Sequence, residues 1–157
     1  MIYSPGEGTL AGLTLKKRGF LAGRLRAVLP AADIHAIGRH AVMVRDETSL
    51  SSPDAAPEGV GSPDANRNVV GDDVLTEGGV SLGTVRDLVL LVGSKGEVIG
   101  YQIDTTEGGK GFIPLPAQLS VSGSTLVVPD VTKDFVTQDL VGLGASVDEF
   151  RARLGLS

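Results

Sequence analysis

Cysteine and tryptophan are absent from this chain of 157 residues, and aromatic residues make up only 4% of it. Without cysteine, disulfide bonds and thiolate metal sites are excluded. With so few aromatic side chains, the interior has to be filled by Val, Leu, Ile and Ala, within a hydrophobic fraction of 41%. The longest uninterrupted apolar run, residues 88–92, is far too short to cross a bilayer as a helix.

The first twelve residues lack the features of a secretory signal. The stretch MIYSPGEGTLAG has no basic start followed by an apolar core. We therefore expect a cytoplasmic protein without a transmembrane segment.

The charge is distributed unevenly, although the net charge is only −5. Residues 1–50 contain seven Lys/Arg against four Asp/Glu, whereas residues 51–157 contain seven against fifteen. A basic half is compatible with binding to nucleic acid or to an anionic membrane. Because no dense Lys/Arg stripe with interleaved aromatic residues is present, we expect instead that the charges are solvated or that the two halves attract each other.

Segment 51–68 is the evident linker. Its sequence, SSPDAAPEGVGSPDANRN, contains one isolated aliphatic residue, Val60. Such a stretch buries too little apolar surface to offset the entropy of ordering, so we expect it to be flexible.

Short strands separated by glycine turns dominate the part after the linker. In residues 97–104, Ile99, Tyr101 and Ile103 alternate with Val98, Gly100, Gln102 and Asp104, which is the period of a half-buried strand. This pattern predicts a mainly β domain, either a small barrel or a sandwich. The expected strands are 69–75, 81–92, 97–104, 112–116 and a hairpin centred on Gly123.

After Pro129 the pattern becomes helical. Residues 132–141 are one candidate for a short helix, and SVDEFRARLG is another. In the second, Ser146 and Glu149 have the spacing of a capping box, and Gly155 would end the helix. One face of this helix would carry Val147, Phe150 and Leu154.

Two stretches of the chain match each other in order. Residues 8–15 (GTLAGLTL) match residues 96–103 (GEVIGYQI), and a Leu-Pro-Ala phrase follows at Leu29 and again at Leu115. Gly38 then matches Gly123. Three anchors in the same order indicate an internal repeat. The first copy has no counterpart of residues 69–89, because it begins in the middle of what would be the second strand.

Residues 69–129 resemble the PRC-barrel family. The hairpin VLTEGGVSLGTVRD, the strand GEVIGY, the entry PLP and the final LVVP occur in the family's order. The family includes the cytoplasmic domain of the photosynthetic reaction-centre H subunit and the C-terminal domain of the ribosome maturation factor. The resemblance implies a small, strongly bent β-barrel that binds other proteins, with no catalytic residues and no cofactor to carry over.

On this basis we expect four parts in the chain. They are a partial PRC-barrel-like copy (1–50), the linker (51–68), a complete PRC-barrel domain (69–130) and a C-terminal helical extension (131–157). Residues 69–157 should fold alone, since they hold a full set of family strands and a capped helix.

Catalytic motifs have weak support. Residues 79–83 (GVSLG) fit the pattern of a nucleophile elbow around Ser81, but that motif needs a strand, a sharp turn and a helix, with the acid and the histidine later in the chain. Both histidines precede Ser81, so we expect a hairpin turn followed by a bulged strand. The glycines of 107–111 (EGGKG) lack the spacing of a phosphate loop.

A metal site is also weakly supported. His35, His40 and Asp33 lie on either side of the turn at Gly38, but their spacing matches no common ligand pattern. We therefore expect neither a metal nor an enzymatic activity, and the resemblance favours an adaptor or scaffold that binds proteins.

Two groups of residues are candidates for partner binding. Arg86 and Asp87 are adjacent in one strand, so one of them should point inward, and an unpaired Asp is costly to bury. We expect Asp87 to accept backbone or Arg hydrogen bonds at a barrel corner. The alternative is that it makes a polar contact to a partner. The other group is a basic loop, formed by Lys16, Lys17, Arg18, Phe20, Arg24 and Arg26. An alternative function uses this loop to bind RNA or the ribosome, and another uses it to bind weakly to a membrane surface, with Phe20 and Leu21 adding apolar contact.

The incomplete first copy predicts self-association. An incomplete barrel exposes unpaired backbone groups along strand edges such as GTLAGLTL and HAVMV, and such edges recruit another strand. We expect a homodimer that forms through residues 1–50. The alternative is that the natural chain starts further upstream and supplies the absent hairpin.

Overall fold

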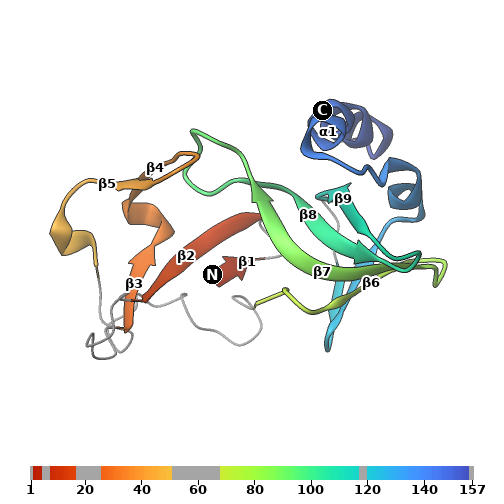
Figure 1. The fold of residues 1–157 in the computed structure, drawn as a ribbon, viewed down its shortest axis with the longest axis horizontal. Coiled ribbons are helices and arrows are strands. Elements are labelled where there is room, and N and C mark those ends of the chain that lie inside the picture. The colour runs from red at the N-terminus through yellow and green to blue at the C-terminus, as the bar shows by residue number, and fades with distance from the viewer. Residues whose placement is uncertain (1, 5–7, 17–25, 51–67, 117–119, 156–157) are drawn as a thin grey trace. The chain divides into compact units, whose positions relative to one another are not determined.

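The chain is mainly β with a C-terminal helix in the computed structural model (Figure 1). The structure describes residues 2–4, 8–16, 26–50, 68–116 and 120–155. It divides into two compact units, which we call unit 1 (Met1–Asn68 with Leu91–Glu97) and unit 2 (Val69–Leu90 with Val98–Ser157). The sequence-based division differs at one place, since it assigns residues 91–97 to the later domain. Within the described ranges, no helix has the length and the apolar character needed to cross a membrane.

Unit 1 contains a three-stranded antiparallel sheet of order β1-β2-β3 and a separate hairpin of β4 and β5. Residues 91–97 complete it, because the amide of Leu10 donates to the Gly96 carbonyl at 2.9 Å and the amide of Ile37 donates to the Ser94 carbonyl at 3.1 Å. The strands are β1 (Ile2–Ser4), β2 (Thr9–Lys16), β3 (Arg26–Pro30), β4 (Ile34–Ile37) and β5 (Val42–Val44), with 3-10 turns at Ala31–Asp33 and Glu47–Ser49.

Unit 2 is built on a six-stranded sheet of order β10-β11-β6-β7-β8-β9, of which Figure 1 labels β6, β7, β8 and β9. All neighbours are antiparallel except β11 and β6, which are parallel. The edge strands β9 and β10 are not paired with each other within the described residues, so the sheet is not seen to close into a barrel. The strands are β6 (Asp73–Thr76), β7 (Ser81–Leu90), β8 (Val98–Thr105), β9 (Lys110–Pro114), β10 (Ser120–Ser122) and β11 (Thr125–Val128).

The C-terminal helix starts earlier than the capping-box pattern predicted. Helix α1 spans Leu140–Arg153, and its N-cap is Asp139, whose carboxylate accepts a hydrogen bond from the Gly142 amide at 2.7 Å. The predicted cap at Ser146 is therefore wrong. That side chain lies inside the helix and donates its hydroxyl proton to the Leu143 carbonyl at 2.9 Å. The predicted end is confirmed, since Gly155 follows the helix with a φ of 71°.

Helix α1 covers one face of the sheet and changes the burial of β8. The alternation predicted for residues 97–104 breaks at Gly100 and Tyr101, which are both buried. Tyr101 faces one side of the sheet, and the other side packs against the helix, where Leu143 and Val147 form an apolar cluster with Phe112. Burial on both faces replaces the half-buried pattern that the sequence predicted.

In both units a glycine is paired with a proline on the neighbouring strand, and the two backbones approach each other closely there. Gly12 on β2 is paired with Pro30 on β3, and Gly100 on β8 is paired with Pro114 on β9. A side-chain Cβ at either glycine would lie too close to the carbonyl oxygen of the residue before that proline, at 2.9 Å in unit 1 and 2.4 Å in unit 2. Only glycine fits such a contact. The register therefore matches Pro30 with Pro114, rather than with the Pro116 of the second Leu-Pro-Ala phrase.

The strand on the other side of each glycine also corresponds. In unit 1, Ile2 of β1 is paired with Gly12, and in unit 2, Val89 of β7 is paired with Gly100. Strand β1 thus occupies the place that the last part of β7 occupies in unit 2.

Candidate functional site

The structure describes only the two ends of the predicted basic loop. Lys16 is the last residue of β2 and Arg26 is the first residue of β3, and the strand register places them opposite each other. The register thus brings two basic positions together at the end of this hairpin. The remaining candidates of the loop lie outside the described residues, namely Lys17, Arg18, Phe20, Leu21 and Arg24.

Arg86 and Asp87 are both exposed, which corrects the prediction that one of them points inward. The pairing of β7 with β8 shifts between Val85 and Asp87, so that Arg86 is an extra residue in a β-bulge and the strict alternation of faces is lost. The Asp87 carboxylate accepts a backbone hydrogen bond from the Leu88 amide at 2.8 Å. This contact agrees with the predicted backbone hydrogen bond.

The Arg86 guanidinium forms an ion pair with Asp104 at 3.6 Å. The two side chains are 67% and 58% exposed, so the pair contributes little to stability. The bulge therefore presents one positive and two negative groups to solvent rather than to the interior.

The residues singled out for chemistry belong to different strands and turns of the two units. Ser81 follows the turn at Gly78 and Gly79 and begins the bulged strand β7, as predicted. His35 is exposed on β4, and His40 is exposed in the turn between β4 and β5. Across the described ranges, no group of three or more His, Asp or Glu side chains is placed to hold a metal ion.

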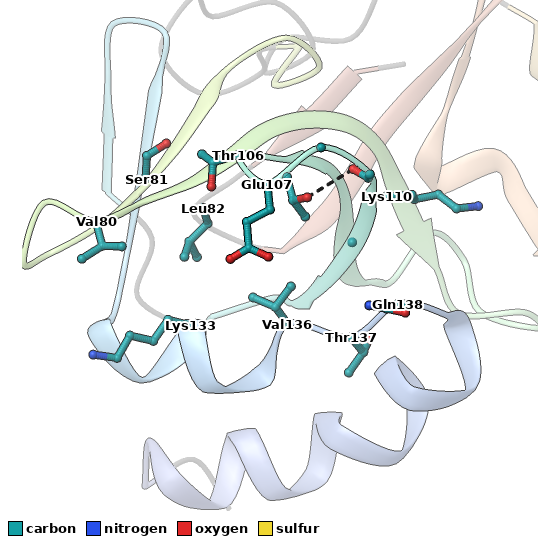
Figure 2. Close-up of a pocket in the computed structure, with 14 residues that line it drawn as sticks. Val80, Ser81, Leu82, Thr106, Glu107, Lys110, Lys133, Val136, Thr137 and Gln138 are labelled. Carbon is teal, nitrogen blue, oxygen red and sulfur yellow. Dashed lines mark hydrogen bonds between the residues drawn. The ribbon is translucent and has the colours of Figure 1, made fainter.

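A pocket of about 500 Å³ lies in unit 2, between the start of β7, the loop that joins β8 to β9, and the segment before α1. Figure 2 shows the Glu107 carboxylate directed into the hollow, with the side chains of Leu82 and Val136 on either side of it. The ammonium groups of Lys110 and Lys133 point away from it. The pocket is therefore a recess of mixed polar and apolar lining with one carboxylate, and its two lysines lie at the rim.

Backbone contacts fix the floor of this pocket. The amide of Phe112 donates to the Thr137 carbonyl at 2.7 Å, and the amide of Thr137 donates back to Phe112 at 2.9 Å, so that residue 137 extends the sheet beyond β9 by one bridge. At Gly111, a Cβ would lie 2.8 Å from the Thr105 methyl group and 3.2 Å from Val136. A larger residue there would fill part of the recess.

Asp130 anchors the β6–β7 turn at the edge of the pocket. Its carboxylate accepts a hydrogen bond from the Gly78 amide at 2.8 Å. This bond, together with the Thr76 hydroxyl, holds the pKa of Asp130 below its ordinary value, because both donors stabilise the carboxylate. The turn that carries Ser81 is thus tied to the 3-10 helix Asp130–Phe135, which supplies Lys133.

The pocket does not contain a connected catalytic set. Among the described residues, no hydrogen bond joins the Ser81 hydroxyl to Glu107, Lys110 or Lys133, although a nucleophile requires such contact with its base. Sequence reasoning did not find this pocket, because its walls come from three segments far apart in the chain. The one available signal is the glycine-rich stretch 107–111, which predicts a turn and lacks the spacing of a phosphate loop.

Comparison of the chain with protein-family models and with curated proteins of known function found no match.

Proposed function

We propose that the protein is a non-enzymatic adaptor that binds other proteins and consists of two related units of the PRC-barrel type. The proposal combines the resemblance of residues 69–129 to that family with the geometry of both units. In unit 2, the strands β6 to β11 follow the order of the family phrases from VLTEGG to LVVP.

The observation that carries the proposal is the equivalent register of the two glycine–proline pairs. Gly12 opposite Pro30 and Gly100 opposite Pro114 lie on the middle and last strands of the same three-strand arrangement. In each unit a two-stranded hairpin follows, β4–β5 in one and β10–β11 in the other. This correspondence supports an origin by duplication of one small β-module, with surfaces rather than a catalytic centre as its functional parts.

A second candidate function is supported by the ends of the basic loop. Lys16 and Arg26 occupy paired backbone positions at the end of the β2–β3 hairpin, and the sequence between them adds Lys17, Arg18 and Arg24. Basic residues gathered in one loop favour a phosphate backbone, so the candidate is an RNA-binding or ribosome-assembly factor. Gel-shift titration with structured RNA at low salt tests it. Phosphate contacts are strongest at low salt, so absence of a shift there removes this candidate.

The experiment that tests the adaptor function is quantitative affinity purification of the tagged full chain from its native cells, followed by reconstitution with the purified candidate. We expect one protein that remains bound at near-stoichiometric amount after nuclease treatment. Recovery of no such protein, or of RNA alone, contradicts the proposal. Strand β2, which contains most of GTLAGLTL, is paired on both sides, with β1 and with β3, so the free edge predicted there is wrong. Light scattering of the purified chain tests in parallel whether the homodimer that we propose forms through the rest of residues 1–50.

A further inference from the structure

Strand β5 has an exposed outer edge. Its side chains are Val42, Met43 and Val44, which are 37%, 55% and 37% exposed. Within the described residues, β4 is its one paired strand. Three consecutive exposed apolar residues on an edge strand are a template for strand addition.

The hydrogen bonds of the neighbouring strand show which backbone groups are available. The amide and carbonyl of Ile37 both bond to residues 93–94, on the side of β4 that faces away from β5. Ile37 and Val42 are therefore a non-hydrogen-bonded pair, and by the same alternation the amide and carbonyl of Val42 point away from β4. Part of the outer edge of β5 thus offers a free donor and a free acceptor in the described part of the chain.

Unit 2 shows what occupies the corresponding edge. Strand β11 is the second strand of the equivalent hairpin, and it pairs with β6 in parallel, with Thr125 opposite Asp73 and Leu126 opposite Val74. The amide of Asp73 bonds to the Ser124 carbonyl at 2.9 Å, so the acidic start of β6 lies beside the hairpin turn. In unit 2 this edge takes a strand that begins with an acid and continues with apolar residues.

The charge beside β5 selects for the same kind of strand. Its turn carries Arg39 and His40, both exposed, where the turn of β10–β11 carries Gly123 and Ser124. Arg45 follows β5 and is exposed. Asp46, the next residue along the chain, already accepts hydrogen bonds from the hydroxyl and the amide of Thr48, which lower its pKa and hold it as a carboxylate.

These charges disfavour a second copy of β5 as the occupant. A two-fold axis would pair β5 with itself in antiparallel orientation, which would bring Arg45 of one strand toward the Arg39 and His40 turn of the other. Like charges at paired positions are unfavourable, whereas an acidic residue at the start of a parallel strand would lie next to that turn.

We propose that the outer edge of β5 binds an extended segment of a partner protein in parallel, with an acidic residue beside Arg39 and His40 and apolar residues beside Met43 and Val44. This inference rests on the proposed adaptor function and names the surface and the chemistry of its partner.

The test is a fluorescence anisotropy titration of the full chain with a labelled peptide, Gly-Asp-Asp-Val-Leu-Thr-Glu-Gly-Gly, which has the sequence of residues 71–79. We expect saturable binding that weakens as salt is raised, because the charge contact is exposed. Arg39→Glu should weaken binding about tenfold or more, since it reverses the contact with the acid. Val42→Pro should abolish binding, because it removes the outward amide.

The controls separate a lost site from a lost fold. Lys133→Glu in unit 2 also exchanges an exposed basic residue for an acid, and it should bind the peptide as the unmodified chain does. A peptide with Lys in place of both Asp residues should not bind. Circular dichroism checks that each variant is folded. If Val42→Pro does not fold, Arg39→Glu alone tests whether the peptide binds at the β5 edge.

Three results would overturn the inference. The first is no binding at peptide concentrations up to about 1 mM, and the second is equal binding by Arg39→Glu and the unmodified chain. The third is concentration-dependent self-association of the chain that Val42→Pro abolishes, because a second copy would then be the occupant of the edge. If the peptide fails while affinity purification yields a stoichiometric protein partner, the adaptor function stands and only the β5 site is wrong.

Discussion

Truncation of Phe150 in helix α1 should strongly lower the stability of unit 2. Its side chain is fully buried, and its ring meets the ring of Phe135 edge-on, with the centroids 5.2 Å apart and the planes at 69°. Replacing a buried Phe with Ala typically lowers the free energy of unfolding by about 3–5 kcal/mol. About 0.5–1.5 kcal/mol of that reflects the edge-to-face pair. For a domain whose total stability is about 5–15 kcal/mol, Phe150→Ala is therefore a severe change.

Urea unfolding followed by far-ultraviolet circular dichroism measures this effect. The matched control is Val141→Ala on the same helix, whose side chain is 83% exposed, and this change should stay within about 0.5 kcal/mol. The double variant with Phe135→Leu separates the ring pair from simple burial, because the two single losses should then add to more than the double loss. A loss below about 1 kcal/mol for Phe150→Ala would refute the packing of α1 on the sheet.

Three further predictions concern single polar groups of unit 2. Asp139→Ala removes the N-cap that holds the Gly142 amide, and it should lower the free energy of unfolding by about 1 kcal/mol in urea titration, whereas Asp139→Ser should retain most of it. The pKa of Asp130 is lowered, so its bond to Gly78 contributes stability above the ordinary carboxyl pKa of 3.8, and this stability is lost as the pH falls through the lowered folded value. On acidification through that range, Asp130→Asn should therefore lose less melting temperature than the unmodified chain. An equal loss contradicts the assignment. Thr132 is fully buried with no hydrogen-bond partner for its hydroxyl among the described residues, so Thr132→Val should leave the melting temperature unchanged or raise it, and a fall equivalent to more than about 1 kcal/mol would show that the hydroxyl is satisfied.

The strands of unit 2 could be predicted from local signals alone. Val-rich runs bounded by glycine turns located β7 and β8 to within about two residues, and Gly123 located the turn between β10 and β11. The predicted strand alternation failed at Gly100, because the sequence does not show that a distant helix covers the second face of β8. Whether the strands close into a PRC-type barrel stays a prediction.

The predicted helix start was wrong because local helix propensity conflicts with tertiary packing. Gly142 and Gly144 lower helix propensity by about 1 kcal/mol each relative to Ala, which favoured a later start at Ser146. Between them lies Leu143, which is completely buried against the sheet. Tertiary packing of this kind commonly overrides propensity, and the aspartate at the true N-cap became informative only once that start was known.

The candidate site was less predictable than the fold. Arg86 and Asp87 were identified as unusual, but the β-bulge that exposes both of them depends on how β7 pairs with β8. The β5 edge was recognised in the phrase HAVMV as an exposed strand. Its preference for an acidic strand emerged only from the register of β11 with β6, which relates residues about 50 positions apart.

The hydrogen bonds between residues 91–97 and the N-terminal strands also set an order of events during synthesis. Domains generally fold as they emerge from the ribosome, with the N-terminal part first. Here the amide of Leu10 needs the carbonyl of Gly96, and Ile37 needs residues 93–94, so unit 1 cannot complete its hydrogen bonding until the chain has been made well past the linker. By then β6 and β7 have already been translated. Unit 1 thus has to wait for residues 91–97 after its own strands have been made, and its strand edges stay open to other chains during that interval.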